Sequence, residues 1–111
     1  MPTQIFTVGQ ELTAFAYEDV TVATVSIGFT EATYSPATFG KAHRAYCTVE
    51  TAQIRFTYNG TAPTTTLGHI AEVGDVIDIS GTDNVAAFRA IRTGATSGTL
   101  RVTFERHRLG A

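Results

Sequence analysis

The clearest pattern along the chain is an alternation of apolar and polar residues over short stretches. In residues 53–58 and 99–105 an apolar side chain stands at every second position. These positions are Ile54, Phe56 and Tyr58 in the first stretch and Leu100, Val102 and Phe104 in the second. A period of two directs one set of side chains to a core and the other to solvent. Both stretches therefore predict half-buried antiparallel strands.

Further strand-sized segments are separated by turn residues. Gly, Asn and Asp tolerate the backbone conformations of tight reversals, and they cluster in residues 59–60, 73–75, 80–84 and 93–98. The remaining segments predict strands over residues 12–17, 20–30, 44–50, 68–72, 75–80 and 85–92. Within them we expect Cys47 and Val49 to share one face, as do Ile77 and Ile79.

Two of these segments break the alternation. Val20 and Val22 follow one phase, whereas Val25, Ile27 and Phe29 follow the other. Such a change of phase predicts a bend at which the strand crosses from one sheet to a second.

In residues 85–92, Phe88 and Ile91 stand three positions apart, which we interpret as a β-bulge in a strand. Residues 30–43 contain Pro36 and Gly40 and show no sustained period, so we expect a long loop there.

The pattern as a whole predicts an all-β fold, an antiparallel β-sandwich of jelly-roll or immunoglobulin-like type with very little helix, because no window shows apolar residues at helical spacing. The 111 residues fit one domain, residues 1–111. Residues 1–10 fit no compact pattern, and we expect an extended N-terminal arm or edge strand that pairs with a neighbour.

Composition narrows the partners. A formal net charge of −2 and a pI near 5.8 give no general attraction to nucleic acid or to anionic membranes.

Cys47 is the single cysteine, so no internal disulfide forms, and its inward position predicts an inert thiol. The first six residues carry no secretory-signal pattern and no stretch reaches transmembrane length, so we expect synthesis in a cytoplasm and no membrane partner.

Charge is unevenly distributed along the chain. We interpret the charged residues as solvated strand faces, with a basic patch that meets an acidic patch on a neighbouring subunit as the alternative. The basic set is Arg89, Arg92, Arg101, Arg106 and Arg108, and the acidic set is Glu11, Glu18, Asp19 and Glu31.

Catalytic and metal-binding patterns are missing from the sequence. There is no Gly-x-Ser-x-Gly elbow and no glycine-rich phosphate loop. The histidines, His43, His69 and His107, read as three unrelated boundary residues, and the aspartates Asp75, Asp78 and Asp83 read as turn formers rather than calcium ligands. We therefore expect no enzyme, no metal and no cofactor.

A carbohydrate-binding module remains an alternative. Such sandwiches lay aromatic rings against sugars, most often Trp, which this chain lacks. The residues that could replace it are Tyr17, Tyr34, Phe39 and Tyr46, although packing in the core or in loops is the favoured interpretation for all four.

Residues 45–106 contain a series of strand and turn motifs: YCTVE (46–50), AQIRF (52–56), NGTAPT (59–64), GHIAEVGD (68–75), AFRAIR (87–92) and LRVTF (100–104). In these motifs the chain resembles a family of small virion proteins of tailed bacteriophages. The resemblance implies a structural role, as a capsid decoration or cement protein on the capsid surface that stabilises the head by binding the major capsid protein. A tail, neck or fibre protein is the close alternative.

The resemblance also implies association with further copies of the chain. We expect other virion proteins as partners and a homo-oligomer, with a trimer as the working assumption. The candidate interface residues, taken from loops and from both ends of the chain, are Ile5, Phe6, Tyr34, Pro36, Phe39, Arg106 and Arg108.

Overall fold

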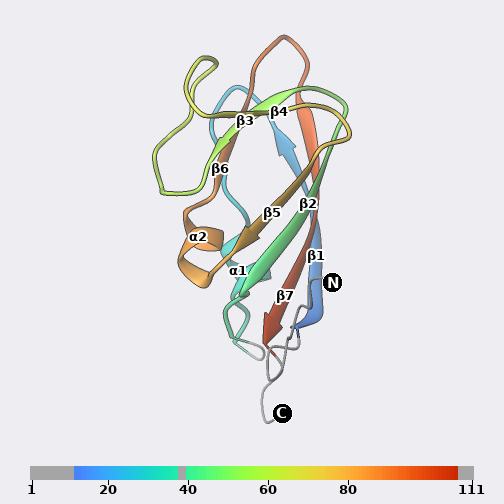
Figure 1. Ribbon diagram of the computed structural model, residues 1–111, viewed down its shortest axis with the longest axis vertical. Helices are drawn as coiled ribbons and strands as arrows, with labels where there is room; N and C mark the ends of the chain where they lie inside the picture. The colour runs from blue at the N-terminus through green and yellow to red at the C-terminus, as the bar shows by residue number, and fades with distance from the viewer. Residues whose placement is uncertain (1–11, 38–39, 108–111) are drawn as a thin grey trace, which may run out of the picture.

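The computed structural model describes residues 12–37 and 40–107, which form two β-sheets packed face to face (Figure 1). The strands are β1 (Leu12–Val22), β2 (Arg44–Glu50), β3 (Ile54–Thr57), β4 (His69–Ala71), β5 (Val76–Ser80), β6 (Arg89–Arg92) and β7 (Gly98–His107). Two helices of four and six residues, α1 (Glu31–Tyr34) and α2 (Thr82–Ala87), lie in the connections.

Every strand pair in both sheets is antiparallel. The larger sheet has the order β1-β7-β2-β5, and the smaller one has the order β4-β3-β6. The predicted all-β antiparallel sandwich with very little helix is therefore confirmed. Strands β5 and β4 stand at the ends of their sheets, and they follow one another in the chain, so the turn between them joins two sheet edges.

The core fills the space between the sheets. As predicted, Leu100, Val102 and Phe104 of β7 are fully buried, and the inward residues of β2 and β5 join them. Phe29 stacks on Phe88 with ring centroids 4.4 Å apart and meets Phe104 edge-on at 5.3 Å. Each buried side chain of this size contributes roughly 1.5–3 kcal/mol to folding.

The end of β3 departs from the predicted pattern. Ile54 is buried and Phe56 packs against the core, but Tyr58 is 45% exposed, so its predicted inward position is wrong. The strand ends at Thr57, which turns inward instead and donates its hydroxyl hydrogen to the Thr61 carbonyl. That hydrogen bond satisfies the buried Thr57 hydroxyl, and the next residue, Tyr58, faces solvent.

The predicted strand over residues 20–30 is wrong beyond Val22, where β1 ends, but the chain does cross to the second sheet in residues 23–30. After β1, the Arg92 amide donates to the Ala23 carbonyl, and Ile27 and Ala90 exchange hydrogen bonds of 2.9 and 2.8 Å, so this segment borders β6 of the second sheet. Of the shifted phase, Phe29 reaches the core, whereas Val25 is 77% and Ile27 40% exposed.

The predicted strand over residues 85–92 is wrong in its first half, where helix α2 runs to Ala87 and β6 begins at Arg89. Val85 and Phe88, three residues apart, are both buried. The bulge predicted from Phe88 and Ile91 is wrong too, because Phe88 precedes β6, in which Ala90 faces the core and Ile91 is only half-buried. The predicted loop over residues 30–43 likewise contains the single turn of α1.

A strained turn joins the two sheets between β2 and β3. Thr51 has φ of 76°, which is unfavourable for a β-branched residue, and the Ala52 amide donates to the Glu50 carbonyl across it. The hydroxyl groups of Thr51 and Thr99 lie 3.2 Å apart. This contact holds the turn against β7 and helps to offset the strain.

Candidate interaction surfaces

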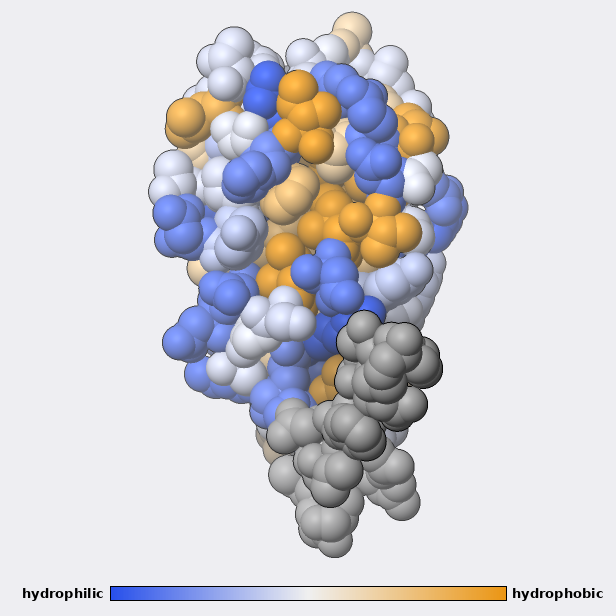
Figure 2. Space-filling model, in the orientation of Figure 1, coloured by the Kyte–Doolittle hydropathy of each residue, from blue (hydrophilic) through white to orange (hydrophobic). Residues whose placement is uncertain are grey.

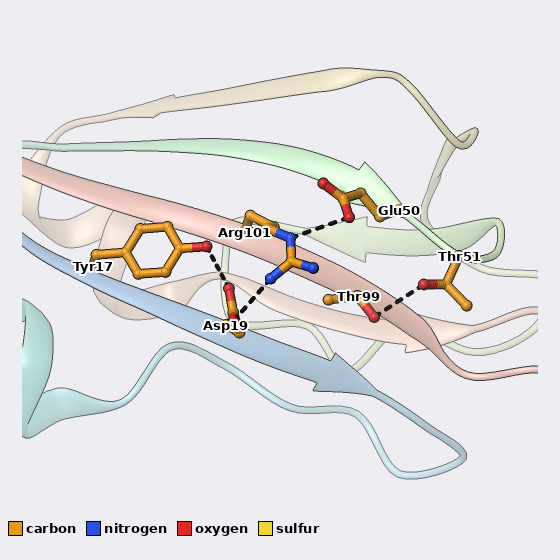
Figure 3. Close-up of polar contacts among 6 residues, drawn as sticks. All are labelled: Tyr17, Asp19, Glu50, Thr51, Thr99 and Arg101. Carbon is orange, nitrogen blue, oxygen red and sulfur yellow. Dashed lines mark hydrogen bonds and ion pairs between the residues drawn. The ribbon is translucent and has the colours of Figure 1, made fainter.

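The first surface is the outer face of the larger sheet, formed by side chains of β1, β7, β2 and β5 that point away from the core. It is polar, and a four-residue network at one end of it joins neighbouring strands (Figure 3). Arg101 donates to Asp19 at 2.9 Å and to Glu50 at 3.1 Å, and so links three strands. Tyr17 donates to Asp19, and this hydrogen bond, together with that from Arg101, lowers the pKa of the Asp19 carboxyl.

A second ion cluster lies at the other end of the same face. Arg44 binds both carboxylate oxygens of Asp78 at 2.8 Å and one oxygen of Glu105 at 2.7 Å. The hydrogen bonds from Arg44 hold the pKa of Asp78 below its usual value. The same guanidinium lies 5.3 Å from the centre of the Tyr46 ring. Its donors are thus engaged within the chain.

These contacts bear on the proposed meeting of basic and acidic patches between subunits. Arg101 pairs with Asp19 of its own chain, and the Glu18 carboxylate accepts hydrogen bonds from the amide and the hydroxyl of Thr30. Arg89 donates to Ser26. The structure therefore pairs several of these charges within the chain.

The second surface is an open groove at the edge of the sandwich, between β4 and β5. This edge groove has a volume of about 430 Å³. Its apolar lining consists of Phe56, Tyr58, Ile70, Ala71, Val76, Ile77 and Ile79.

The rim of the edge groove exposes apolar surface. Val76 is 52% exposed, Ile70 48% and Tyr58 45%, while Ile77 and Ile79 below them are buried. In Figure 2 apolar side chains gather in the middle of the visible face, over β5, with polar residues around them. A contiguous apolar patch with a polar rim is typical of a protein interaction site.

The backbone of β5 adds polar groups to this groove that have no partner among the described residues. The Val49 amide donates to the Asp75 carbonyl and the Gly81 amide to the His43 carbonyl, so the odd-numbered residues of β5 are those that bond to β2. In an antiparallel pair the intervening residues, here Val76 and Asp78, direct their amides and carbonyls to the opposite side. That side is the free edge of the sheet.

Two of the three histidines lie together, so their description as unrelated is wrong. The rings of His43 and His107 stack 4.1 Å apart, and the His107 amide donates to Nδ1 of His43 at 3.0 Å. Burial, and then the neighbouring His107, lower the pKa of His43. His69 instead stacks on Tyr58. Within residues 12–37 and 40–107 no three His, Cys, Asp or Glu side chains gather as metal ligands.

Cys47 lies inside the core, as predicted. Its side chain is fully buried, and this burial raises the pKa of the thiol to about 12. A thiol in that state is protonated and shielded at neutral pH, and therefore a poor nucleophile.

The candidate interface residues divide into two groups. Tyr34 is half-buried with its ring against Phe104, Pro36 is half-buried with its carbonyl bound by the Gly40 amide, and Arg106 lies near the end of β7. Ile5, Phe6, Phe39 and Arg108 lie outside the described residues. Tyr34, Pro36 and Arg106 do not line the edge groove.

The sequence did contain a signal for the edge groove. In residues 75–80, Val76 stands in the solvent-facing set of alternate positions, together with Asp78 and Ser80. Ile70 and Val73 also stand at positions where the strand and turn patterns predict exposure to solvent. Apolar residues in the solvent phase of neighbouring strands indicate a surface that another molecule covers.

Comparison with models of known protein families, with curated proteins and with solved structures finds no match to this chain. In the part of the chain that the structure describes, no helix is long and apolar enough to cross a membrane.

Proposed function

We propose that this protein is a non-enzymatic structural component of a tailed-phage virion, a decoration protein that binds the major capsid protein and stabilises the head. The observation that carries the proposal is the edge groove, where exposed apolar side chains lie beside an unpaired sheet edge. Such a surface is suited to burial against protein. The assignment to a virion rests on the resemblance of residues 45–106 to small phage virion proteins.

The energetics of the surface suit a repetitive assembly. Each exposed apolar side chain contributes roughly 25 cal/mol for every Å² that a partner covers, so one groove alone supports a modest affinity. Many copies on a symmetric shell convert modest contacts into strong attachment, because each further contact of a linked set forms at a high effective concentration.

Binding to undecorated capsids tests the proposal. We expect purified protein to bind at a fixed ratio to the major capsid protein and to raise the melting temperature of the particles. Ile70→Asp, which places a charge on the rim of the groove, should weaken this binding, whereas Val25→Asp, at an exposed site away from the groove, should not. Failure to bind heads, tails or any other virion component would refute the proposal.

The location within the virion is tested separately. Mass spectrometry of separated heads and tails should find the protein with the heads. Recovery with tails only would replace the decoration role with that of a tail, neck or fibre protein.

A carbohydrate-binding role is the second candidate, and one observation favours it. Tyr17, 55% exposed, and Tyr46, 39% exposed, both pair with Thr103 and so lie in one row of the outer face, about 10 Å apart at two strand spacings. Exposed rings on a polar face can stack against sugars. Glycan binding lost in Tyr17→Ala and Tyr46→Ala but kept in Tyr58→Ala would support this role.

A further inference from the structure

The free edge of β5 has the features of an acceptor for an added strand. We propose that residues 4–8 of a second copy (QIFTV) pair with Val76–Ser80 and fill the edge groove, joining copies of the protein into an oligomer. The inference rests on the proposed function, since copies joined through this groove would attach to the capsid as a linked set, and it specifies where the expected N-terminal arm binds.

The backbone of β5 supplies the hydrogen-bonding groups. Val76 and Asp78 direct an amide and a carbonyl each toward the open edge, and no hydrogen bond within the described residues occupies them. The Ser80 carbonyl already accepts a hydrogen bond from the Asn84 side chain at 2.9 Å, which ends the free stretch at that residue. A short added strand would therefore find a donor and an acceptor at Val76 and at Asp78, and a donor at Ser80.

The groove supplies apolar contacts at the same place. An added strand places alternate side chains on opposite faces, so Phe6 and Val8 would share one face. That face would lie over the opening between β4 and β5, where Ile70 and Val76 are half exposed.

Charge is compatible with this occupant. Asp75 and Asp78 lie at the groove, and Asp78 is already paired with Arg44. Residues 1–8 contain no charged side chain, so docking would neither repel these carboxylates nor remove a side-chain charge from water.

The length of the chain between the arm and β1 selects a second copy. An added strand beyond β5 would lie four strand spacings from β1, about 19 Å across the sheet. The four steps from residue 8 to Leu12, where β1 begins, span about 14 Å when fully extended. Residues 4–8 therefore cannot reach the β5 edge of their own sheet.

The test uses purified protein without capsids. Full-length protein should be oligomeric by light scattering, and a variant lacking residues 2–8 should be monomeric with an unchanged circular dichroism spectrum. A labelled peptide of residues 1–10 should bind the shortened variant, and its binding should slow hydrogen exchange of the Val76 and Asp78 amides at least tenfold.

Two lysine substitutions separate the groove from the general surface. Val76→Lys, at the β5 edge, should weaken peptide binding at least tenfold, whereas Val25→Lys, the same change at a site that is 77% exposed, should leave it unchanged. Thermal melting of both variants checks that each is folded.

Three results would overturn the inference: a monomeric full-length protein, an oligomer that survives removal of residues 2–8, or peptide binding that Val76→Lys and Val25→Lys affect equally. The last two would mean that a different segment or partner covers the groove. These results are independent of the virion role. If the protein binds capsids but residues 4–8 do not pair with a second copy, the proposed function stands and the inference falls. If residues 4–8 pair with a second copy but the protein binds no virion component, only the inference stands.

Discussion

The outer face of the larger sheet and the edge groove are a few residues apart on the same strand, yet they differ in what they leave unsatisfied. On the outer face, Asp78 of β5 is bound by Arg44, and Arg101 joins Asp19 and Glu50. At the groove, about half of the surface of Val76, two residues before Asp78, is exposed, and its backbone amide and carbonyl face the edge of the sheet. A face whose polar groups are paired within the chain gains little from a partner, whereas an edge with open apolar and backbone groups gains both contacts and hydrogen bonds.

The largest expected effect is a difference in stability between a substitution on the inward side of β5 and one at the rim of the groove. Ile77→Ala removes a buried side chain below the groove and should lower the free energy of unfolding by about 2–4 kcal/mol. Val76→Ala, one residue away and 52% exposed, should change it by less than about 0.5 kcal/mol. Urea denaturation measures both. Similar losses in the two variants would show that the rim belongs to the core.

Next in size is the removal of the ion cluster that ties β5 to the sheet. Arg44→Met leaves Asp78 and Glu105 without their shared partner and should cost about 1 kcal/mol, moderated by the partial exposure of Asp78. Arg101→Met, in the more exposed network, should cost less. Equal stability of the Arg44 variant and the parent protein in urea would contradict a structural role for this cluster.

Acid should affect the outer face by a smaller amount. Because the pKa of Asp78 is lower in the folded state than its usual value near 3.8, the unfolded chain binds the proton more readily. The contribution of Asp78 to stability is therefore present above about pH 4 and is lost as the pH falls through the folded pKa. Urea melts between about pH 2 and pH 6 should show this loss, and Asp78→Asn should reduce it. An identical pH profile in the variant would assign the effect to other groups.

The smallest effect is expected from Tyr17→Phe, which deletes only the hydroxyl that donates to Asp19. Both residues are exposed, so water replaces the lost hydrogen bond and stability should not change measurably. A clear loss in thermal or urea denaturation would mean that the outer face is more tightly coupled to folding than its exposure indicates.

The sequence allowed the inward faces of β2, β5 and β7 to be predicted, because a period of two reports directly which side chains share a face. It failed where local spacing was ambiguous: the spacing of Phe88 and Ile91 suggested a bulge in a strand over residues 85–92, but α2 runs to Ala87 and β6 begins only at Arg89. The edge groove was missed for a different reason. Val76 is part of an open edge only because β5 ends its sheet beside β4, and strand order is set by long-range packing.

The location of the single thiol makes the protein convenient for chemical probing. Cys47 is sealed between the sheets and protonated at neutral pH, so alkylating reagents reach it only when the sandwich opens. Its rate of alkylation thus measures how often the native state opens. For the same reason, a cysteine introduced on the surface would carry a spectroscopic label alone, without removal of the natural one.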